Sequence, residues 1–247
     1  MSVVTPSYNQ AEFIEENLRS VLRSSSDVEH VVVDGGSDDG TVEILHEYED
    51  DYDLRWVSEP DRGQSHALNK GIKMSTGDWI GFQMSDDYYL EGAFETALET
   101  IDAHPGADVV YGDVIHVDAD GNEVSRTFNI PPSRFIQRYW SLYSNLQSAF
   151  FRSALFEDLE AFDEDLEYTM DADLFWRLLD ANVTQVHVPV FLGTFRTHEA
   201  AKTPSRSKAD ERAEWDSIYG DYNGRLEAHL PSPLLRSVAK ALKAAKL

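Results

Sequence analysis

The chain has 247 residues, of which 42% are hydrophobic, so it can bury a sizeable core and is not a mostly disordered protein. Its 45 acidic residues outnumber its 21 basic ones, and the resulting net charge of -24 repels polyanions and argues against nucleic acid as a partner. Because cysteine is absent, disulfides, thiolate nucleophiles and thiolate-bound zinc are excluded.

The N-terminal segment MSVVTPSYNQ has no basic leader and no long apolar run. No stretch of the sequence approaches the roughly 20 consecutive apolar residues that a membrane-spanning helix needs. We therefore expect a cytoplasmic protein that does not span the membrane.

Strand and helix patterns alternate through the first hundred residues. Apolar runs predict strands at 3–4, 30–33, 54–57 and 79–82, and helical spacing predicts helices over 13–22, from about 41, over 65–74 and over 92–104. This alternation is typical of an α/β protein built on a parallel sheet.

The second half of the chain predicts a mixed sheet. A strand is expected at 109–111, and Asp120-Gly121 between the apolar runs 114–117 and 124–128 predicts a hairpin. Thr169 is expected to cap a helix that continues to about Ala181, and a last strand is expected at 186–195.

Loops rich in oxygen ligands follow three of the predicted strands, at 5–9, 34–40 and 85–87. In an open α/β sheet such loops converge on one crevice, where ligands bind. Asp34 at a strand end suits hydrogen bonds from a base or a ribose. The pair Asp86-Asp87 offers hard ligands for Mg²⁺ or Mn²⁺, although a helix cap or a solvated turn would also use it.

A set of ordered motifs makes the interpretation specific. In the first half these are Thr5-Pro6-Ser7-Tyr8-Asn9, Val33-Asp34-Gly35-Gly36-Ser37-Asp38-Asp39-Gly40-Thr41, Glu59-Pro60-Asp61-Arg62-Gly63-Gln64-Ser65 with Ala67, Asn69 and Gly71, Thr76-Gly77-Asp78, and Ser85-Asp86-Asp87. The second half adds Gln147-Ser148-Ala149-Phe150-Phe151-Arg152, Met170-Asp171-Ala172-Asp173-Leu174 and Phe195-Arg196-Thr197-His198. Together the motifs resemble those of the inverting family 2 glycosyltransferases with the GT-A fold.

This resemblance implies a Rossmann-like, nucleotide-sugar-binding mixed sheet flanked by helices. It implies one GT-A domain over 1–203, with a donor half at about 1–112 and an acceptor half at about 113–203, and a helical extension over 204–247. The sequence departs from the pattern at Met84, where many relatives carry Asn or Asp, and this reduces the expected metal motif to Ser85-Asp86-Asp87.

The resemblance also implies the residues of the site. The donor would contact Thr5, Pro6 and Tyr8 around the nucleobase, Asp34 at its edge, Asp61, Asn69, Asp86 toward the ribose or sugar, and Arg196. A divalent cation, Mn²⁺ or Mg²⁺, would be held by Asp87 and His198. The partners implied are a nucleotide-diphosphate sugar donor and a glycan or lipid-linked acceptor. Without this context, Tyr8 would be a packing residue and His198 an ordinary loop residue.

The charge of the chain supports an ion at the site, because a protein of net charge -24 needs inserted cations to hold a diphosphate. The candidate protein cations are Arg62, Lys70, Arg196 and Lys202. The acidic composition with few lysines also resembles that of halophilic archaeal proteins, which implies a salt-rich habitat.

Helical geometry selects Asp171 as the catalytic base, because it shares the inward face of its helix with Leu174 and Leu178. A first-turn acid favoured by the helix dipole is the simpler alternative. Asp173 lies on the polar face with Arg177, and we interpret the two as a surface ion pair.

Other functions and roles stay open at this point. Gly63-Gln64-Ser65-His66-Ala67 approximates the nucleophile elbow of a hydrolase, although charged residues precede it. A non-catalytic homologue that binds nucleotide sugars or partners is the alternative that Met84 suggests. The segment 234–247 has four cations and no acid, and it is either a membrane-surface helix or a helix packed on the domain.

Overall fold

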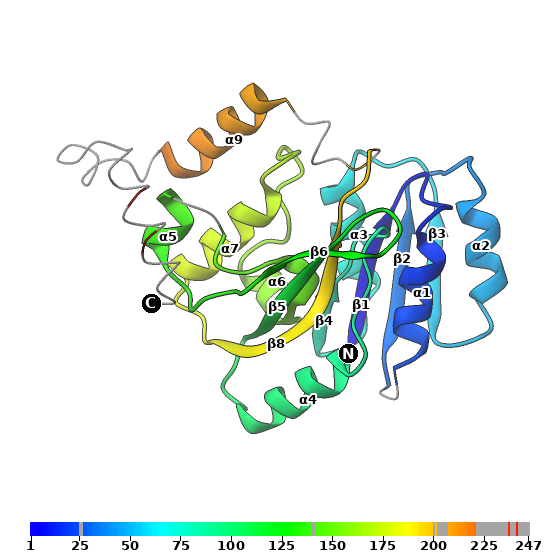
Figure 1. The fold of residues 1–247 in the computed structure, drawn as a ribbon, viewed down its shortest axis with the longest axis horizontal. Helices are drawn as coiled ribbons and strands as arrows, with labels where there is room; N and C mark the ends of the chain where they lie inside the picture. Colours follow the sequence, from blue (N-terminus) through cyan, green and yellow to red (C-terminus); the bar gives the residue numbers. More distant parts are fainter. Residues whose placement is uncertain are drawn as a thin grey trace.

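The computed structural model describes residues 1–24, 27–139, 142–199, 201, 207–220, 237 and 241. An eight-stranded mixed sheet runs through the molecule, with helices on both of its faces (Figure 1). The predicted α/β class is therefore confirmed.

Four parallel strands form the first half of the sheet in the order β3-β2-β1-β4. The strands are β1 (Ser2–Ser7), β2 (Glu29–Asp34), β3 (Leu54–Ser58) and β4 (Trp79–Phe82). Between and after them lie α1 (Ile14–Leu22), α2 (Thr41–Tyr48), α3 (Gln64–Met74) and α4 (Ala93–Ala103). The predicted alternation of strand and helix is confirmed, as is the parallel pairing that it implies.

The second half adds β5 (Val109–Val117), β6 (Glu123–Thr127), β7 (Ala149–Arg152) and β8 (Gln185–Arg196). β7 runs antiparallel between β4 and β5, β6 forms a hairpin with β5, and β8 runs parallel to β5. The mixed sheet and the hairpin are confirmed. The two runs predicted at 109–111 and 114–117 belong to one strand, and β7 was not predicted as a strand.

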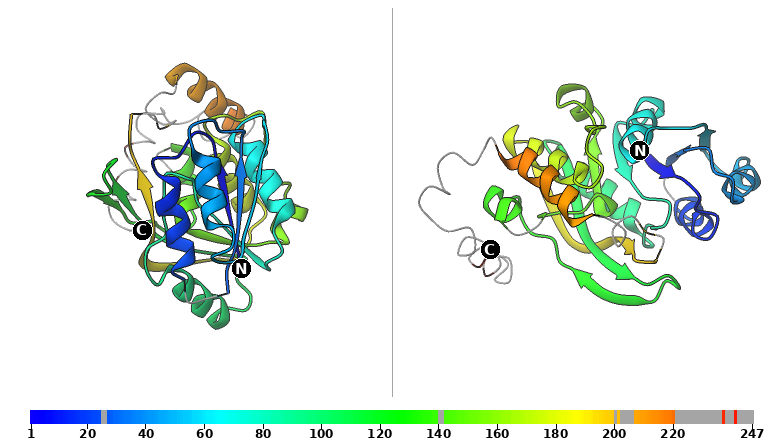
Figure 2. Two further views of the ribbon diagram at one scale, coloured as in Figure 1. Left: turned by 90° about the vertical axis from the view of Figure 1, so that its right-hand side faces the viewer. Right: turned by 90° about the horizontal axis from the view of Figure 1, so that it is seen from above.

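The remaining elements cover the second half of the sheet. They are α5 (Arg134–Tyr139), the 3₁₀ turn η1 (Leu146–Ser148), α6 (Leu155–Asp158), α7 (Met170–Asp180) and α9 (Lys208–Gly220). Helix α9 falls within the predicted helical extension, and it lies beside α7 in both Figure 1 and the right-hand view of Figure 2. The basic segment 234–247 lies outside the described residues apart from Ser237 and Ala241.

Both faces of the central strands are buried, which explains their nearly continuous apolar sequences. Val4 packs in the core cluster that contains Leu68 of α3, whereas its neighbour Val3 packs with Phe94 of α4 on the opposite face. Neighbouring side chains of a strand alternate between faces, so one short run can serve two helical layers.

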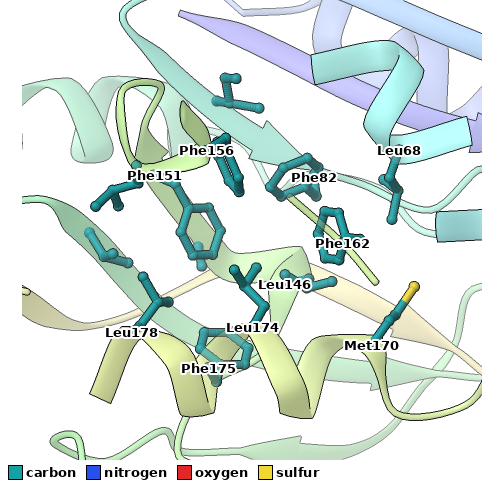
Figure 3. Close-up of a cluster of buried hydrophobic side chains, with 14 of the residues drawn as sticks. Leu68, Phe82, Leu146, Phe151, Phe156, Phe162, Met170, Leu174, Phe175 and Leu178 are labelled. Carbon is teal, nitrogen blue, oxygen red and sulfur yellow. The ribbon is translucent and has the colours of Figure 1, made fainter. Parts of the chain in front are cut away.

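A cluster of aromatic and aliphatic side chains joins the sheet to α7 (Figure 3). The ring of Phe82 lies 5.6 Å from that of Phe151 and 5.2 Å from that of Phe162, measured between centroids. Leu174 and Leu178 project from α7 into the same cluster and are fully buried. This packing fixes α7 against the sheet and therefore fixes where its first turn lies.

Strand β8 passes so close to η1 that only glycine fits at position 193. A Cβ on Gly193 would lie 2.0 Å from the carbonyl oxygen of Gln147, which is backbone and cannot rotate away. We expect Gly193→Ala to lower the free energy of unfolding by about 3 kcal/mol, as overpacking does. Urea denaturation measures it, with Gly106→Ala as the control because a Cβ on Gly106 meets nothing within 4 Å. Equal stability of the two variants would contradict the close approach.

In the described part of the chain, no helix combines the length and the apolar character that crossing a membrane requires.

Candidate active site

A cavity of about 830 Å³ opens where the parallel strands end. The loops after β1, β2, β3 and β4 line it together with η1, the start of α7 and the end of β8. Its lining residues include Pro6, Ser7, Tyr8, Gly35, Asp61, Gln64, Met84, Asp86, Asp87, Leu146, Gln147, Glu167, Tyr168, Met170, Asp171 and Arg196. The structure thus brings the three oxygen-rich loops of the sequence into one crevice.

Pro6, Tyr8 and Asp61 all line this cavity, and their contact with a donor stays a prediction. Tyr8 is 62% exposed, so its ring is available to a ligand and is not a packing residue. A Cβ on Gly35 would lie 3.0 Å from a carboxylate oxygen of Asp61 and 3.3 Å from the Tyr8 ring. The backbone of Gly35 therefore lies close to both the Tyr8 ring and the Asp61 carboxylate, and a side chain at this position would crowd them.

Asp34 does not line the cavity in this structure, and its contact with a nucleobase stays a prediction. Its fully buried carboxylate accepts hydrogen bonds from the backbone N–H of Gly36 at 3.0 Å and of Ser37 at 2.9 Å, and from the Ser58 hydroxyl at 2.6 Å. Such bonds stabilise a turn. Asp34 therefore shapes the loop that presents Gly35 to the cavity.

Thr5 and Asn69 also lie behind the cavity wall. The buried Thr5 hydroxyl lies 2.9 Å from Nε2 of His30, and burial lowers the pKa of His30 to about 3. The amide of Asn69 donates to the carbonyl of Phe162 and its oxygen accepts from the backbone N–H of Phe162, both at 2.8 Å. These partners occupy both side chains in this structure, and the expected donor contacts of Thr5 and Asn69 stay predictions.

The Asp86-Asp87 pair lies in the cavity wall directly after β4. Asp86 Oδ2 lies 3.1 Å from Nε2 of His198, whose imidazole therefore faces the carboxylate. Asp87 is only 3% exposed, and its carboxylate accepts from the backbone N–H of Arg196 at 2.6 Å and from the Gln147 amide at 3.1 Å. The two adjacent carboxylates thus have different surroundings.

Burial and the neighbouring charge of Asp86 raise the pKa of Asp87 well above its ordinary value, despite the two hydrogen bonds. Each oxygen of Asp87 already accepts one hydrogen bond from the protein, and metal ligation by Asp87 stays a prediction. Asp86 and His198 offer a carboxylate and an imidazole that lie 3.1 Å apart.

This donor set fits a divalent cation that takes its remaining ligands from elsewhere. Among the described residues, no group of three His, Asp or Glu side chains could hold a metal alone. A cation that uses one carboxylate, one imidazole and phosphate oxygens of a substrate needs no such group. Met84 cannot replace the missing oxygen ligand, and its sulfur contacts the side-chain amide of Gln64.

Arg196 lines the cavity, but its guanidinium is turned into the protein. Nε donates to the carbonyl of Asp86 at 2.7 Å, Nη1 donates to the carbonyl of Ala119 at 2.6 Å, and Nη2 pairs with Glu16. The rings of Phe13 and Tyr88 flank the group at 5.1 and 5.5 Å. Arg196 therefore ties the Asp86 turn to the hairpin and to α1. Its contact with a diphosphate stays a prediction.

The other candidate cations are engaged elsewhere or lie outside the described residues. Arg62 pairs with Glu164 and Lys70 pairs with Glu59, and neither cation lines the cavity. Lys202 lies outside the described residues. Within the described lining, carboxylates outnumber cations, so the expectation that a bound diphosphate needs an added cation gains support.

Asp171 lies in the first turn of α7 and lines the cavity. Its Oδ1 accepts a hydrogen bond from the backbone N–H of Ala172 at 2.7 Å. Leu174 and Leu178 lie buried beneath it, as the helical spacing predicted. A half-buried carboxylate at the edge of a cavity suits an exchange of protons with a ligand.

The predicted ion pair between Asp173 and Arg177 is confirmed at 2.8 Å. The pair is more than a surface feature, because Arg177 also donates three hydrogen bonds of 2.6 to 2.7 Å to the carbonyls of Leu159, Glu160 and Ala161. Arg177 therefore holds the loop that leads toward the cavity.

The hydrolase alternative is not supported. Ser65 is 4% exposed, and its hydroxyl donates to the carbonyl of Leu166 at 3.2 Å and contacts the sulfur of Met170. It lies in the first turn of α3, which the five-residue charged loop 59–63 separates from the end of β3 at Ser58. A nucleophile elbow instead places the serine on a sharp strand-to-helix turn.

Several cavity residues received no role in the sequence analysis. Gln147 was part of a motif but had no function, and its amide now contacts Asp87. Glu167, Tyr168 and Met170 complete the wall beside Asp171. The sequence could have indicated these three residues, because they lie just before Asp171.

The fold is that of known sugar-transferring proteins. It matches S. aureus TarS 1-349 in complex with UDP-GlcNAc with a TM-score of 0.75 and 23% identity, over 96% of this chain and 70% of that chain. It matches the mannosyltransferase PcManGT from Pyrobaculum calidifontis, in complex with GDP-Man and Mn²⁺, with a TM-score of 0.69 and 20% identity, over 99% of this chain and 74% of that chain. The expected GT-A fold is thereby confirmed.

Curated relatives are glycosyltransferases too. The chain is 30% identical over 192 residues to the uncharacterized glycosyltransferase EpsJ of Bacillus subtilis, covering 70% of this chain and 54% of that protein. It is 28% identical over 189 residues to chondroitin synthase of Escherichia coli, covering 72% of this chain and 26% of that protein. The chain thus spans about half of the first relative and about a quarter of the second.

The family profile extends over most of the fold described above. The profile described as Glycosyl transferase family 2 matches residues 2–162, which include all four parallel strands and the Asp86-Asp87 turn. Together with the cavity at the carboxyl ends of those strands, this match shows that the chain belongs to glycosyl transferase family 2.

Proposed function

We propose that this chain transfers a sugar from a nucleotide-diphosphate sugar to a hydroxyl acceptor, with inversion at the anomeric carbon. The observation that carries the proposal is one cavity that holds an exposed aromatic ring, Tyr8, a carboxylate pair, Asp86-Asp87, and a separate carboxylate, Asp171. The ring of Tyr8 would stack on a nucleobase, the carboxylate pair would bind a cation, and Asp171 would act as the base.

The donor would lie along the wall made by the first half of the chain. Pro6 and Tyr8 offer apolar and aromatic surface to a nucleobase, and Asp61 offers an acceptor for its N–H groups or for ribose hydroxyls. Support comes from the similar folds of TarS, solved with UDP-GlcNAc, and PcManGT, solved with GDP-Man.

Asp86 and His198 would hold Mn²⁺ or Mg²⁺. When bound, that ion neutralises the diphosphate and makes it a better leaving group. Asp87 would position Asp86, because its hydrogen bonds from the Arg196 backbone and the Gln147 amide fix the turn that carries Asp86.

Asp171 would act as the general base. Its carboxylate takes the proton of the acceptor hydroxyl while that oxygen forms a bond to the anomeric carbon and the bond from this carbon to the diphosphate breaks. A single displacement of this kind inverts the anomeric centre. The acceptor would enter beside Asn145, Leu146 and Tyr168, which line the cavity near Asp171.

The acceptor class proposed is a glycan or a lipid-linked glycan, extended by one sugar. The basic segment 234–247 is the part of the sequence suited to contact an anionic membrane surface that carries such an acceptor.

Release of nucleoside diphosphate from UDP-, GDP- and dTDP-sugars tests the proposal, with a membrane-lipid extract as the acceptor source. The assay uses molar potassium chloride, because the acidic composition resembles that of halophilic proteins. We expect one donor to turn over in the presence of Mn²⁺ or Mg²⁺ and turnover to fall to background with a chelator, because the cavity has few cations of its own.

Two controls make the result decisive. Asp86→Asn should weaken the response to metal, whereas Asp78→Asn, in the loop before β4, should not. Folded protein that binds a donor but never turns it over would favour the non-catalytic homologue, and absence of both binding and turnover would reject the proposed function.

A further inference from the structure

A side chain of α9 forms hydrogen bonds with the segment that leads into α7. Helix α9 lies beside α7, and its Trp215 and Ile218 pack against the core cluster that contains Leu174 (Figures 1 and 2). The residue before Trp215 is Glu214, which reaches the segment that precedes α7.

The Glu214 carboxylate accepts four hydrogen bonds from three consecutive residues. Oε1 accepts from the backbone N–H of Glu167 at 2.9 Å. Oε2 accepts from the backbone N–H of Tyr168 at 2.9 Å and of Thr169 at 3.0 Å, and from the Thr169 hydroxyl at 2.9 Å. One side chain thereby fixes the backbone of 167–169.

Glu214 does not cap α7 itself, because its four hydrogen bonds come from the N-cap residue and the two residues before it, and not from the first N–H groups of the helix. Thr169 is the N-cap residue, as predicted, but its side chain makes no capping hydrogen bond to the helix. Its hydroxyl donates to Glu214 instead. The position of the N-cap residue therefore depends on a residue that is 45 positions away in the sequence.

The charged form of Glu214 is favoured at this place. Partial burial acts to raise its pKa, but the hydrogen bonds from Glu167, Tyr168 and Thr169 outweigh burial and hold the pKa below its ordinary value. The carboxylate is therefore ionised at neutral pH, and ionised acceptors form the stronger hydrogen bonds.

The segment held by Glu214 is part of the cavity wall. Glu167 and Tyr168 line the cavity on one side of Thr169, and Met170 and Asp171 line it on the other. One residue, Met170, separates the fixed backbone of Thr169 from Asp171. A shift of the segment would move that carboxylate relative to a bound acceptor.

We propose that Glu214 is a positioning residue for Asp171: by binding the backbone of 167–169 it sets where the Asp171 carboxylate faces the cavity. The inference rests on the proposed function for its catalytic consequence, and on the hydrogen bonds alone for its structural part. The inference gives helix α9 a role in the acceptor half of the site. This helix lies outside residues 2–162, the part of the chain that matches the family profile.

The test compares wild type with Glu214→Gln, which keeps the size of the side chain but replaces one acceptor oxygen with an N–H₂ donor. Asp210→Asn is the matched control, because Asp210 is an exposed carboxylate in the first turn of the same helix. Three quantities are measured: kcat and the donor KM for transfer, the Kd of the donor, and amide hydrogen exchange over 163–176.

We expect Glu214→Gln to lower kcat by about 10- to 100-fold, because a displacement of about 1 Å at a reacting group costs that much. The donor KM and Kd should stay at the wild-type values, because Tyr8 and Asp61 belong to the loops after β1 and β3, which Glu214 does not contact through any of these four hydrogen bonds. Amides over 163–176 should exchange faster in Glu214→Gln and at the wild-type rate in Asp210→Asn.

A wild-type kcat in Glu214→Gln would overturn the inference, as would unchanged amide exchange. A parallel loss of kcat and donor affinity would also overturn it, because that pattern indicates general damage to the site. Failure of the proposed function looks different: wild type and both variants would then all lack transfer. Faster exchange confined to Glu214→Gln would in that case uphold the structural part, the fixing of 167–169 by Glu214, and unchanged exchange would reject it.

Discussion

Asp171→Asn is expected to reduce sugar transfer by about 10²- to 10⁴-fold while leaving donor binding intact, because a general base contributes a factor of this size. Asparagine keeps the shape of the side chain but cannot take a proton. The carboxylate lines the cavity in the first turn of α7, whereas Tyr8 and Asp61 belong to the loops after β1 and β3. Chemistry and donor binding should therefore separate.

The measurement is kcat for transfer together with the donor Kd, for a variant shown to be folded by circular dichroism. Asp173→Asn is the matched control, because it removes a carboxylate from the same helix turn, where Asp173 pairs with Arg177 and does not line the cavity. Near wild-type kcat in Asp171→Asn would show that another group takes the proton. It would also reduce Asp171 to the simpler alternative, a first-turn acid favoured by the helix dipole.

Arg196→Met is expected to lower the free energy of unfolding by about 3 kcal/mol, since removing a buried partner leaves its acceptors without hydrogen bonds. The Arg196 guanidinium donates to the carbonyls of Asp86 and Ala119 and pairs with Glu16. Its side chain is 2% exposed. Methionine fills part of the volume but offers no donor.

The same variant should weaken metal-dependent donor binding, because Arg196 holds the turn that carries Asp86. Urea denaturation gives the stability and calorimetry gives the donor Kd with Mn²⁺. Arg126→Met is the control: Arg126 pairs with Glu123 on an exposed strand, and such a pair contributes at most about 1 kcal/mol. If Arg196→Met were as stable as this control, the buried network around Arg196 would not be what fixes the turn.

Much of the fold could be predicted because its signals are local. The runs at 30–33 and 79–82 are β-branched or aromatic, and each is followed by a turn and an amphipathic helix. Strands and helices of this kind depend on periodicity within about ten residues. Strand β7 was missed because its four residues, Ala149–Arg152, carry no alternation and owe their strand conformation to partners on both sides, β4 and β5.

The candidate site could be predicted in its composition but not in the orientation of its side chains. The ordered motifs led to the family and to the cavity that holds Tyr8, Asp61 and Asp171. The motifs did not show which of their side chains point into the cavity and which form hydrogen bonds within their own loop. The motif around Asp34, for example, did not indicate that its carboxylate binds its own loop in this structure.

The sequence by itself determined the α/β class, the parallel first half, the family and the acidic character of the site, since each depends on residue types and their local order. The tertiary structure decided that Arg196 turns inward to Glu16 and that Glu214 binds Thr169. Those contacts join residues 180 and 45 positions apart. No local pattern specifies them, because a buried polar side chain takes whichever partner the packed helices and strands bring within hydrogen-bonding distance.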